Sequence, residues 1–291
     1  MFSGSLVAIV TPMRSDGTVD LDAWARLIDF HVSNDSDGII IGGTTGESAT
    51  LSDVELRELA AHAYERVKGR LKLLVGAGVS GTAATVERVR AFSELPVDGL
   101  LVVTPAYNRP SQEGLYQHFA AVAAAARKPL VLYNVPARTA VDMKPTTVAR
   151  LSKVAGIVGV KEAVPEVGRV RELIDRCGRD FAILSGDDAT ARASILAGAH
   201  GVISVTANVA PRVMSEMVVA ARAGQSSRPE QLDGPLAALH RELFVEANPI
   251  PVKWLLAQMG LIGPRLRLPL TPLAEEHHAA VREAARAAGV L

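Results

Sequence analysis

The sequence has one cysteine, no excess of charge of either sign and no long apolar run. With Cys177 alone there can be no intrachain disulfide, which is typical of a reducing compartment. Lys and Arg (31) balance Asp and Glu (31), so no global field attracts nucleic acid or an anionic membrane. No run reaches the roughly 18 apolar residues of a membrane span, and the N-terminus lacks the basic segment of a signal peptide. We therefore expect a cytoplasmic enzyme without nucleic-acid or membrane partners.

Short runs of valine, isoleucine and leucine recur along the chain, and segments with helical periodicity separate them. Continuous apolar character is typical of strands buried on both faces, as in parallel sheets. Eight such runs in 291 residues fit a closed barrel, which takes about 250 residues. We expect a TIM (β/α)8 barrel with strands over residues 6–11, 39–44, 73–77, 99–104, 130–134, 157–161, 181–185 and 201–206.

Predicted helix starts support this alternation of strands and helices, which the C-terminal part of the chain does not continue. The predicted starts are the capping box Ser52/Glu55 before residues 53–68, Ser111 before 112–127, and Pro145 before 146–153. After Thr206 no further strand is predicted, and several helices follow, the last starting at Thr271-Pro272. We expect a barrel over residues 1–210 and a C-terminal helical extension over 211–291, within one structural unit.

Lys161 is the residue that packing explains least, because it lies in an apolar run, GIVGVKEA, at residues 156–163. Burying an unpaired ammonium is costly, so such a lysine is neutralised, paired or used in chemistry. A desolvated lysine keeps some free amine near neutral pH and can form a Schiff base with a carbonyl. The alternative is a strand-end lysine whose stem packs and whose head reaches water.

The carboxyl ends of the predicted strands collect hydroxyls and glycines, and working residues of such barrels lie there. Lys161 is the one lysine among them, and two of the four tyrosines, Tyr107 and Tyr133, join it. The loop at residues 43–47 offers backbone N–H groups for a carboxylate or phosphate, or is simply a glycine turn. Arg138 could clamp a second carboxylate, or be an ordinary surface arginine.

Two other motifs are weaker. Asp187-Asp188 favours a helix cap over a metal site, since no further ligand stands at the right spacing, and His277-His278 is expected to be solvated. Residues 76–81 fit GxGxxG, yet no acidic residue ends the next strand, which argues against a dinucleotide site.

Together these motifs resemble the dihydrodipicolinate synthase family, within the pyruvate-dependent class I aldolases, over nearly the whole chain. The matching segments are GSLVAIVTP at 4–12, GTTGES at 43–48, YNRPSQEGLYQHF at 107–119, LYNVP at 132–136, RT at 138–139, VKEA at 160–163, LSGDD at 184–188, GVISVTAN at 201–208 and FVE at 244–246.

The resemblance implies a TIM-barrel enzyme that condenses pyruvate with L-aspartate 4-semialdehyde. Lys161 would form an imine with pyruvate, a methyl proton would leave to give an enamine, and attack on the aldehyde with cyclisation would give 4-hydroxy-tetrahydrodipicolinate. This is the first committed step of lysine and diaminopimelate biosynthesis. Tyr133 matches the general acid/base, and Thr44 and Tyr107 match its relay partners, with Tyr107 supplied across a dimer interface.

The same resemblance implies the substrate contacts and the assembly. Thr45 matches a binder of the pyruvate carboxylate and Arg138 a receiver of the aldehyde's carboxylate, while Gly186 and the Ile203 carbonyl line the pocket. No organic cofactor is implied, because the lysine itself is the electron sink, and no metal is expected. The family is commonly a homotetramer of two tight dimers.

The chain departs from relatives at several positions. Ala140 replaces a frequent glycine and Val164 a frequent serine or threonine, with modest effects expected. The cleft that binds inhibitory lysine in some relatives keeps Ser48 and Ala49. It has lost a carboxylate and an aromatic wall, which predicts weak or absent inhibition by lysine; the changed positions are Asp53, Leu56, Ser80, Ala84 and Ala106.

Two alternatives remain open at this point. Another pyruvate-lysine aldolase, such as an N-acetylneuraminate or keto-deoxy-sugar lyase, would share the nucleophile. A catalytically silent barrel would act as a binding protein, but it would be expected to lack Lys161 or Tyr133.

Overall fold

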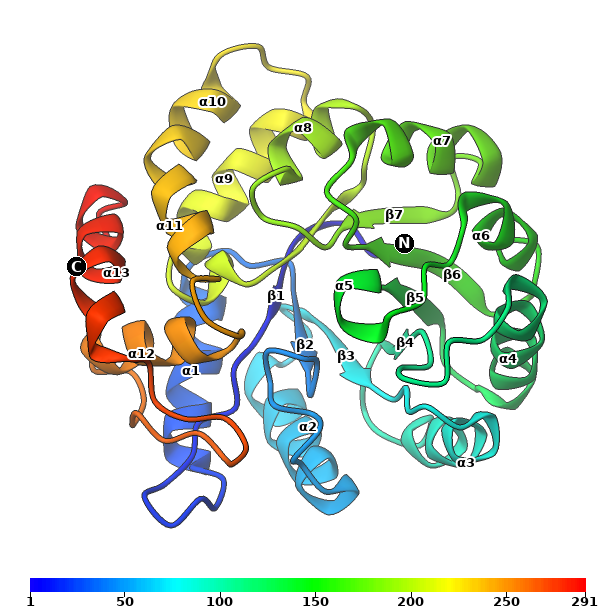
Figure 1. Cartoon of the computed structure of the whole chain (residues 1–291), viewed down its shortest axis with the longest axis horizontal. Coiled ribbons are helices and arrows are strands. Elements are labelled where there is room, and N and C mark those ends of the chain that lie inside the picture. Colours follow the sequence, from blue (N-terminus) through cyan, green and yellow to red (C-terminus); the bar gives the residue numbers. More distant parts are fainter.

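The computed structural model describes all of residues 1–291 and confirms the predicted barrel. Eight parallel strands pair in sequence order, and β1 also pairs with β8, so the sheet closes (Figure 1). The strands are β1 (Gly4–Ala8), β2 (Gly38–Ile41), β3 (Lys72–Gly76), β4 (Gly99–Val103), β5 (Leu130–Asn134), β6 (Ile157–Glu162), β7 (Ala182–Ser185) and β8 (Gly201–Ser204).

Because side chains alternate across each strand, the barrel has two separate apolar layers. A small cluster of 11 buried residues fills the interior and includes Leu6, Tyr133 and Ile203. A cluster of 70 buried residues lies outside the strands and beneath the helices. Lys161 lies near the end of a strand, so we expect its neighbours in this interior layer.

Helices surround the barrel, and the capping box predicted at Ser52 and Glu55 is present. The helices between strands are α1 (Leu21–Ser33), α2 (Asp53–Val67), α3 (Thr82–Phe92), α4 (Gln112–Ala125), α5 (Pro136–Thr139), α6 (Pro145–Leu151), α7 (Val167–Cys177) and α8 (Ala191–Leu196). No helix is both long enough and apolar enough to span a membrane.

Further helices follow β8 and gather on one side of the barrel, with α13 at the C-terminus (Figure 1). Of these, α9 packs against β1, β8 and α8. The elements are the 3-10 turns η1 (Thr206–Asn208) and η2 (Gly234–Leu236) and the helices α9 (Pro211–Arg222), α10 (Arg228–Asp233), α11 (Ala237–Glu242), α12 (Ile250–Gln258) and α13 (Glu275–Ala287).

Two expectations for the last helix are wrong. It begins at Glu275 and not at Thr271-Pro272, because the N–H of Ala274 is bound by the Glu246 carboxylate and the first turn forms beyond it. His278 is also not fully solvated, because it is half-buried. Its ring stacks on Trp254 with centroids 4.6 Å apart, and its Nε2 lies 3.1 Å from the Leu273 carbonyl.

Candidate active site

Lys161 lies near the carboxyl end of β6 and is only 6% exposed. It is in register with Tyr133 on β5 and Leu184 on β7, both of which belong to the interior cluster. Its Nζ lies 4.4 Å from the centroid of the Tyr133 ring. The structure thus brings the predicted nucleophile and the predicted acid/base together, in an apolar setting with little access to water.

Gly186 and Ile203 flank this lysine from the next two strands. A Cβ on Gly186 would lie 3.1 Å from Lys161 Cε and 2.9 Å from Ala163 Cβ, so glycine leaves the space that the lysine stem fills. Ile203 on β8 is 1% exposed and belongs to the same interior cluster as Tyr133. Both predicted pocket positions therefore lie on the buried side of the site.

Thr44 and Tyr133 line one hollow at the carboxyl ends of β2 to β5. Its volume is about 200 Å³, below the roughly 300–1,000 Å³ of sites for drug-sized ligands. Tyr133 connects this hollow to Lys161, which fits a substrate of few atoms. The other lining residues are Gly42, Gly43, Ser48, Ala49, Gly76, Gly78, Val79, Ser80, Arg88, Leu101, Val103 and Ala106.

The loop after β2 carries both predicted threonines in one compact turn. The N–H of Glu47 donates to the Thr44 carbonyl at 3.1 Å. The N–H groups of Thr44 and Thr45 donate to no backbone acceptor. Thr45 is buried, and its Oγ1 accepts a hydrogen bond from Asn248 Nδ2 at 2.9 Å. Free N–H groups beside a fixed hydroxyl are suited to hold a carboxylate.

Arg138 lies on the short helix α5, directly after β5, and is exposed. Its Nη2 donates to the Asn248 carbonyl at 3.4 Å, and it has no carboxylate partner within the chain. Its remaining N–H donors can therefore receive a carboxylate from a ligand at the barrel mouth.

Tyr107 is the predicted site residue that the single chain does not bring to the others. It is 95% exposed and has a left-handed backbone, with φ of 74°. Its neighbour Arg109 (φ 47°) and the facing Ala140 (φ 58°) share this strained conformation. Strain collected at strand ends is typical of functional sites. Within the single chain, the exposed phenol therefore stays apart from Lys161 and Tyr133.

A buried polar network lies behind Lys161, on the outer face of β5 and β6. Glu162 Oε2 lies 2.8 Å from Arg169 Nε, and Asn134 Nδ2 donates to the carboxylates of Glu162 and Asp142. Burial raises the pKa of Glu162 above its ordinary value, against the opposing effect of Arg169. Burial acts the same way on Asp142, but its hydrogen bonds hold the pKa of that carboxyl below the ordinary value.

The two departures near the site lie at defined features of the backbone. Val164 binds Glu162 Oε1 through its N–H at 3.0 Å, so a serine or threonine there could make the same contact. Ala140 ends α5 with a positive φ, where a glycine would avoid the strain.

Three residues that contact the loop at residues 43–50 were not predicted from the sequence: Asn248, Lys253 and Arg267. Lys253 had a usable signal, because it lies in the apolar helix IPVKWLLAQ and raises the same question as Lys161. Asn248 and Arg267 had none, since their partners lie about 200 residues away along the chain.

Both residues of the aspartate pair accept hydrogen bonds from neighbouring segments of the chain. Asp187 Oδ2 accepts from the N–H and hydroxyl of Thr190, just before α8, as a cap does. Asp188 instead accepts from the N–H groups of Val205 and Thr206 and fixes the end of β8. No group of three potential metal ligands occurs in the structure.

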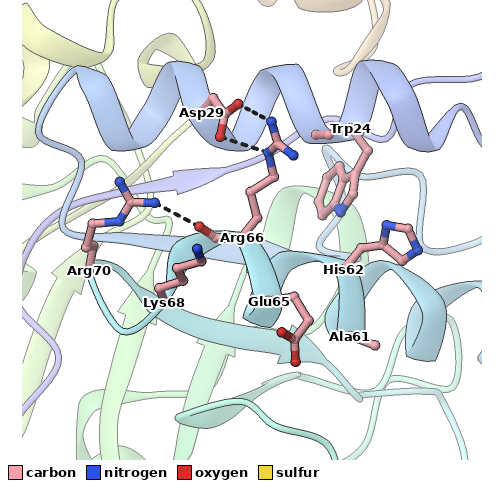
Figure 2. Close-up of a pocket in the computed structure, with 9 residues that line it drawn as sticks. Trp24, Asp29, Ala61, His62, Glu65, Arg66, Lys68 and Arg70 are labelled. Carbon is pink, nitrogen blue, oxygen red and sulfur yellow. Dashed lines mark hydrogen bonds and ion pairs between the residues drawn. The ribbon is translucent and has the colours of Figure 1, made fainter.

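A larger hollow of about 480 Å³ lies between α1 and α2, on the outside of the barrel (Figure 2). Figure 2 shows Arg66 directed at Asp29, with Nε 2.8 Å from Oδ1, and Arg70 donating to the Arg66 carbonyl. Its one ion pair, Arg66 with Asp29, is exposed, and none of its charged groups is desolvated at a strand end, so it does not compete with the barrel mouth.

Comparison with known proteins decides which family carries this geometry. The model of the dihydrodipicolinate synthetase family matches residues 1–288. The chain belongs to this family. A relative named 4-hydroxy-tetrahydrodipicolinate synthase from Alkalilimnicola ehrlichii is 50% identical over 291 residues, covering 100% of both chains. One of the same name from Thioalkalivibrio sulfidiphilus is 51% identical, covering 100% of this chain and 99% of its own.

Solved structures of the dihydrodipicolinate synthetase family agree. The chloride-inhibited dihydrodipicolinate synthase of Acinetobacter baumannii, complexed with pyruvate, matches with a TM-score of 0.98 at 45% identity and covers 100% of both chains. Family membership and fold thus rest on the entire chain, and the sugar-acid lyase alternative gains no support.

Proposed function

We propose that this chain condenses pyruvate with L-aspartate 4-semialdehyde through an imine on Lys161, giving 4-hydroxy-tetrahydrodipicolinate. Family membership, the names of the relatives and the pyruvate bound by the A. baumannii relative support this. The observation that carries the proposal is a buried lysine at the carboxyl end of a barrel strand, 4.4 Å from the ring centroid of Tyr133.

The chemistry follows from the positions of these two residues. The free amine of Lys161 attacks the ketone, and loss of water gives an imine that withdraws electrons from the adjacent methyl group. A base removes a methyl proton, and the resulting enamine attacks the aldehyde carbon, which becomes a hydroxyl-bearing carbon. The amino group of the semialdehyde then attacks the imine carbon and displaces the Lys161 amine, which closes the ring and frees the lysine. Tyr133 is the acid/base that we propose for these transfers, with Thr44 at the same hollow as its relay partner.

Two carboxylates have to be held, and the barrel mouth offers one site for each. We assign the pyruvate carboxylate to Thr45 and the free N–H groups beside it, and the carboxylate of the semialdehyde to exposed Arg138. Gly186 and the Ile203 carbonyl complete the pocket around the lysine. The lysine acts as the electron sink, so the proposed reaction uses no organic cofactor.

We further propose that Tyr107 completes the relay in a neighbouring subunit, within a cytoplasmic homotetramer of two dimers. Its 95% exposure supports this, because a phenol that contacts so little of its own chain contributes through another. The single cysteine of the chain fits the proposed compartment.

Borohydride reduction in the presence of pyruvate, followed by peptide mass mapping, tests the proposal. We expect one pyruvate-derived adduct, on the peptide that contains Lys161. Lys161→Ala should abolish both adduct and turnover, whereas the matched control Lys153→Ala, at an exposed lysine, should keep both. An adduct on another peptide would overturn the mechanism. Faster turnover of sugar acids than of the semialdehyde would overturn the substrate assignment.

A further inference from the structure

A buried ion pair joins the C-terminal helices to the loop that carries Thr44 and Thr45. Lys253 Nζ on α12 lies 2.5 Å from Glu47 Oε1, and both side chains are almost fully inaccessible, at 0% and 1%. The same Nζ donates to the Thr11 carbonyl at 2.9 Å, at the end of the segment after β1. Buried charges persist only when geometry and additional hydrogen bonds compensate their desolvation, so this contact is a fixed feature of the fold.

The second carboxylate oxygen of Glu47 is bound from another part of the C-terminal region. Glu47 Oε2 accepts from the Arg267 N–H at 3.0 Å. The guanidinium of Arg267 in turn donates to the Thr50 carbonyl at 2.7 Å and pairs with Glu55. The Glu47 carboxylate therefore accepts from two donors in the C-terminal region, Lys253 Nζ and the backbone N–H of Arg267. Arg267 also binds the end of the loop, at the Thr50 carbonyl.

The backbone of Glu47 is hydrogen-bonded directly to that of Thr44. Glu47 has a left-handed backbone with φ of 57°, which is unfavourable for a residue with a side chain. In this conformation its N–H donates to the Thr44 carbonyl, and the Ser48 N–H donates to the Gly43 carbonyl at 3.3 Å. The residue whose side chain is bound by the C-terminal region is therefore also the one whose backbone closes the turn around Thr44.

The segment just before α12 reaches the neighbouring threonine. Asn248 Nδ2 donates to Thr45 Oγ1 at 2.9 Å, independently of the ion pair. Arg138 lies on α5 and has no hydrogen bond to Glu47 or Lys253, so loss of the pair would leave its backbone in place. This separation allows the role of the pair to be tested.

We propose that Glu47 and Lys253 are positioning residues for the reaction: their buried pair holds residues 43–50 in the conformation that presents Thr44 and Thr45 to the imine on Lys161. This inference rests on the proposed function. It makes the C-terminal helices part of the catalytic apparatus, since α12 supplies the cation.

Glu47→Gln is the first test. Both carboxylate oxygens accept from donors, and an amide has only one acceptor oxygen, so one of the two contacts becomes repulsive. We expect kcat to fall by about 10²-fold, the loss typical of a reacting group displaced by roughly 1 Å. KM for pyruvate should rise, KM for the semialdehyde should stay close to its original value, and borohydride should still trap pyruvate on Lys161.

A double-mutant cycle separates positioning from general destabilisation. If Glu47 acts through Thr44, then Glu47→Gln should cost little in kcat once Thr44→Val has removed the hydroxyl, and the two losses should not multiply. Losses that multiply in the double variant would overturn the proposal.

Two further variants keep the test decisive if Glu47→Gln folds poorly. Glu47→Leu combined with Lys253→Met replaces the pair with apolar groups and should restore thermal stability, while kcat stays low. Recovery of full kcat with stability would show a purely structural pair and overturn the proposal. Asp233→Asn is the control: it damages another buried ion pair, with Arg192 and His240, and should lower stability without raising KM for pyruvate.

The original chain keeps the two proposals distinguishable. If it neither turns over the semialdehyde nor forms the Lys161 adduct, the proposed function fails. If it does both and the cycle shows no coupling between Glu47 and Thr44, only the positioning role fails.

Discussion

Lys161 Nζ lies 4.4 Å from the centroid of the Tyr133 ring, and the two residues are partners in the β5–β6 ladder. The ring lies against the lysine amine, and Tyr133 also lines the hollow shared with Thr44, where we propose that its hydroxyl acts. The ring and the hydroxyl therefore have separate tasks, which a single oxygen deletion can separate.

Tyr133→Phe should retain the apolar contact and lose the proton transfer. We expect kcat to fall by about 10²–10⁴-fold, the usual contribution of general acid–base catalysis, with a smaller change in KM for pyruvate. Steady-state kinetics check the first expectation, and borohydride trapping of a Lys161 adduct checks that the site is intact. Turnover within a factor of two or three of the original would remove Tyr133 from the mechanism.

Gly186→Ala should impair the enzyme by displacing the lysine. The new Cβ would lie 3.1 Å from Lys161 Cε and 2.9 Å from Ala163 Cβ, closer than such contacts normally are. We expect slower imine formation, measured as the rate of trapping under saturating pyruvate, and a modest loss of thermal stability. Gly168→Ala is the matched control, because nothing lies within 4 Å of its added Cβ. Equal behaviour of the two variants would show that Gly186 has no steric role.

Lysine should inhibit this chain weakly or not at all. Ser48, Ala49 and Ser80 line the small hollow, but Arg88 also faces it and pairs with Asp53 at 2.8 Å. Asp53 is thus already engaged by Arg88, and the small hollow itself holds no carboxylate for the ammonium of a bound lysine. Steady-state assays with lysine up to millimolar concentration check this, and strong inhibition at submillimolar lysine would contradict it.

Much of the barrel could be predicted because its strands are continuous apolar runs between turn-forming residues. The ends were harder to place. Residues 9–11 are as apolar as a strand, yet β1 stops at Ala8, because the Val10 N–H binds the side chain of Asn208 and not a neighbouring strand. The predicted second strand ran to Thr44, but Gly42 takes a φ of 60° and turns the chain after Ile41.

The site could be predicted only in part, for a physical reason. Lys161 and Tyr133 can be recognised from the local sequence, because each is a polar, reactive residue at the end of an apolar run. The support for Thr45 comes from Asn248, and that for Glu47 from Lys253, across more than 200 residues. The hydrophobic periodicity of the sequence does not indicate which distant donor binds which acceptor. The domain boundary at residue 210 and the assembly stay predictions.

The stability of the fold should fall in mild acid because of His31. This residue is completely buried on α1, its Nδ1 lies 2.9 Å from Ser36 Oγ, and burial lowers its pKa to about 3. The unfolded chain takes up this proton near pH 6.5. The stabilisation by neutral His31 is therefore fully present above about pH 6.5 and is lost as the pH falls toward 3.

His31→Asn keeps a polar atom near the position of Nδ1 and removes the titration. Below about pH 6, we expect the slope of unfolding free energy against pH to decrease by about 1.4 kcal/mol per pH unit. Urea unfolding at a series of pH values measures it. His62→Gln, at an exposed histidine, should leave the slope unchanged. An equal slope in His31→Asn and the original chain would assign the acid sensitivity to other groups.

Tyr107 gives the sharpest test of the proposed assembly, because the proposal has it act on a partner's site. Tyr107→Phe and Lys161→Ala should each lose most activity as separate proteins. In a mixed dimer, one site combines the intact Lys161 of the first chain with the intact Tyr107 of the second. After unfolding and refolding an equimolar mixture, half of the dimers are mixed, and activity should return to roughly a quarter of the original.

The alternative makes a different prediction from the same mixture. If each Tyr107 served the Lys161 of its own chain, every site would still lack one of the two residues, and mixing would give only the average of the two parents. Size-exclusion chromatography verifies that dimers have re-formed, and Tyr107→Phe mixed with the original chain gives the reference for refolding yield. Recovery therefore requires both an assembled dimer and a tyrosine that crosses its interface.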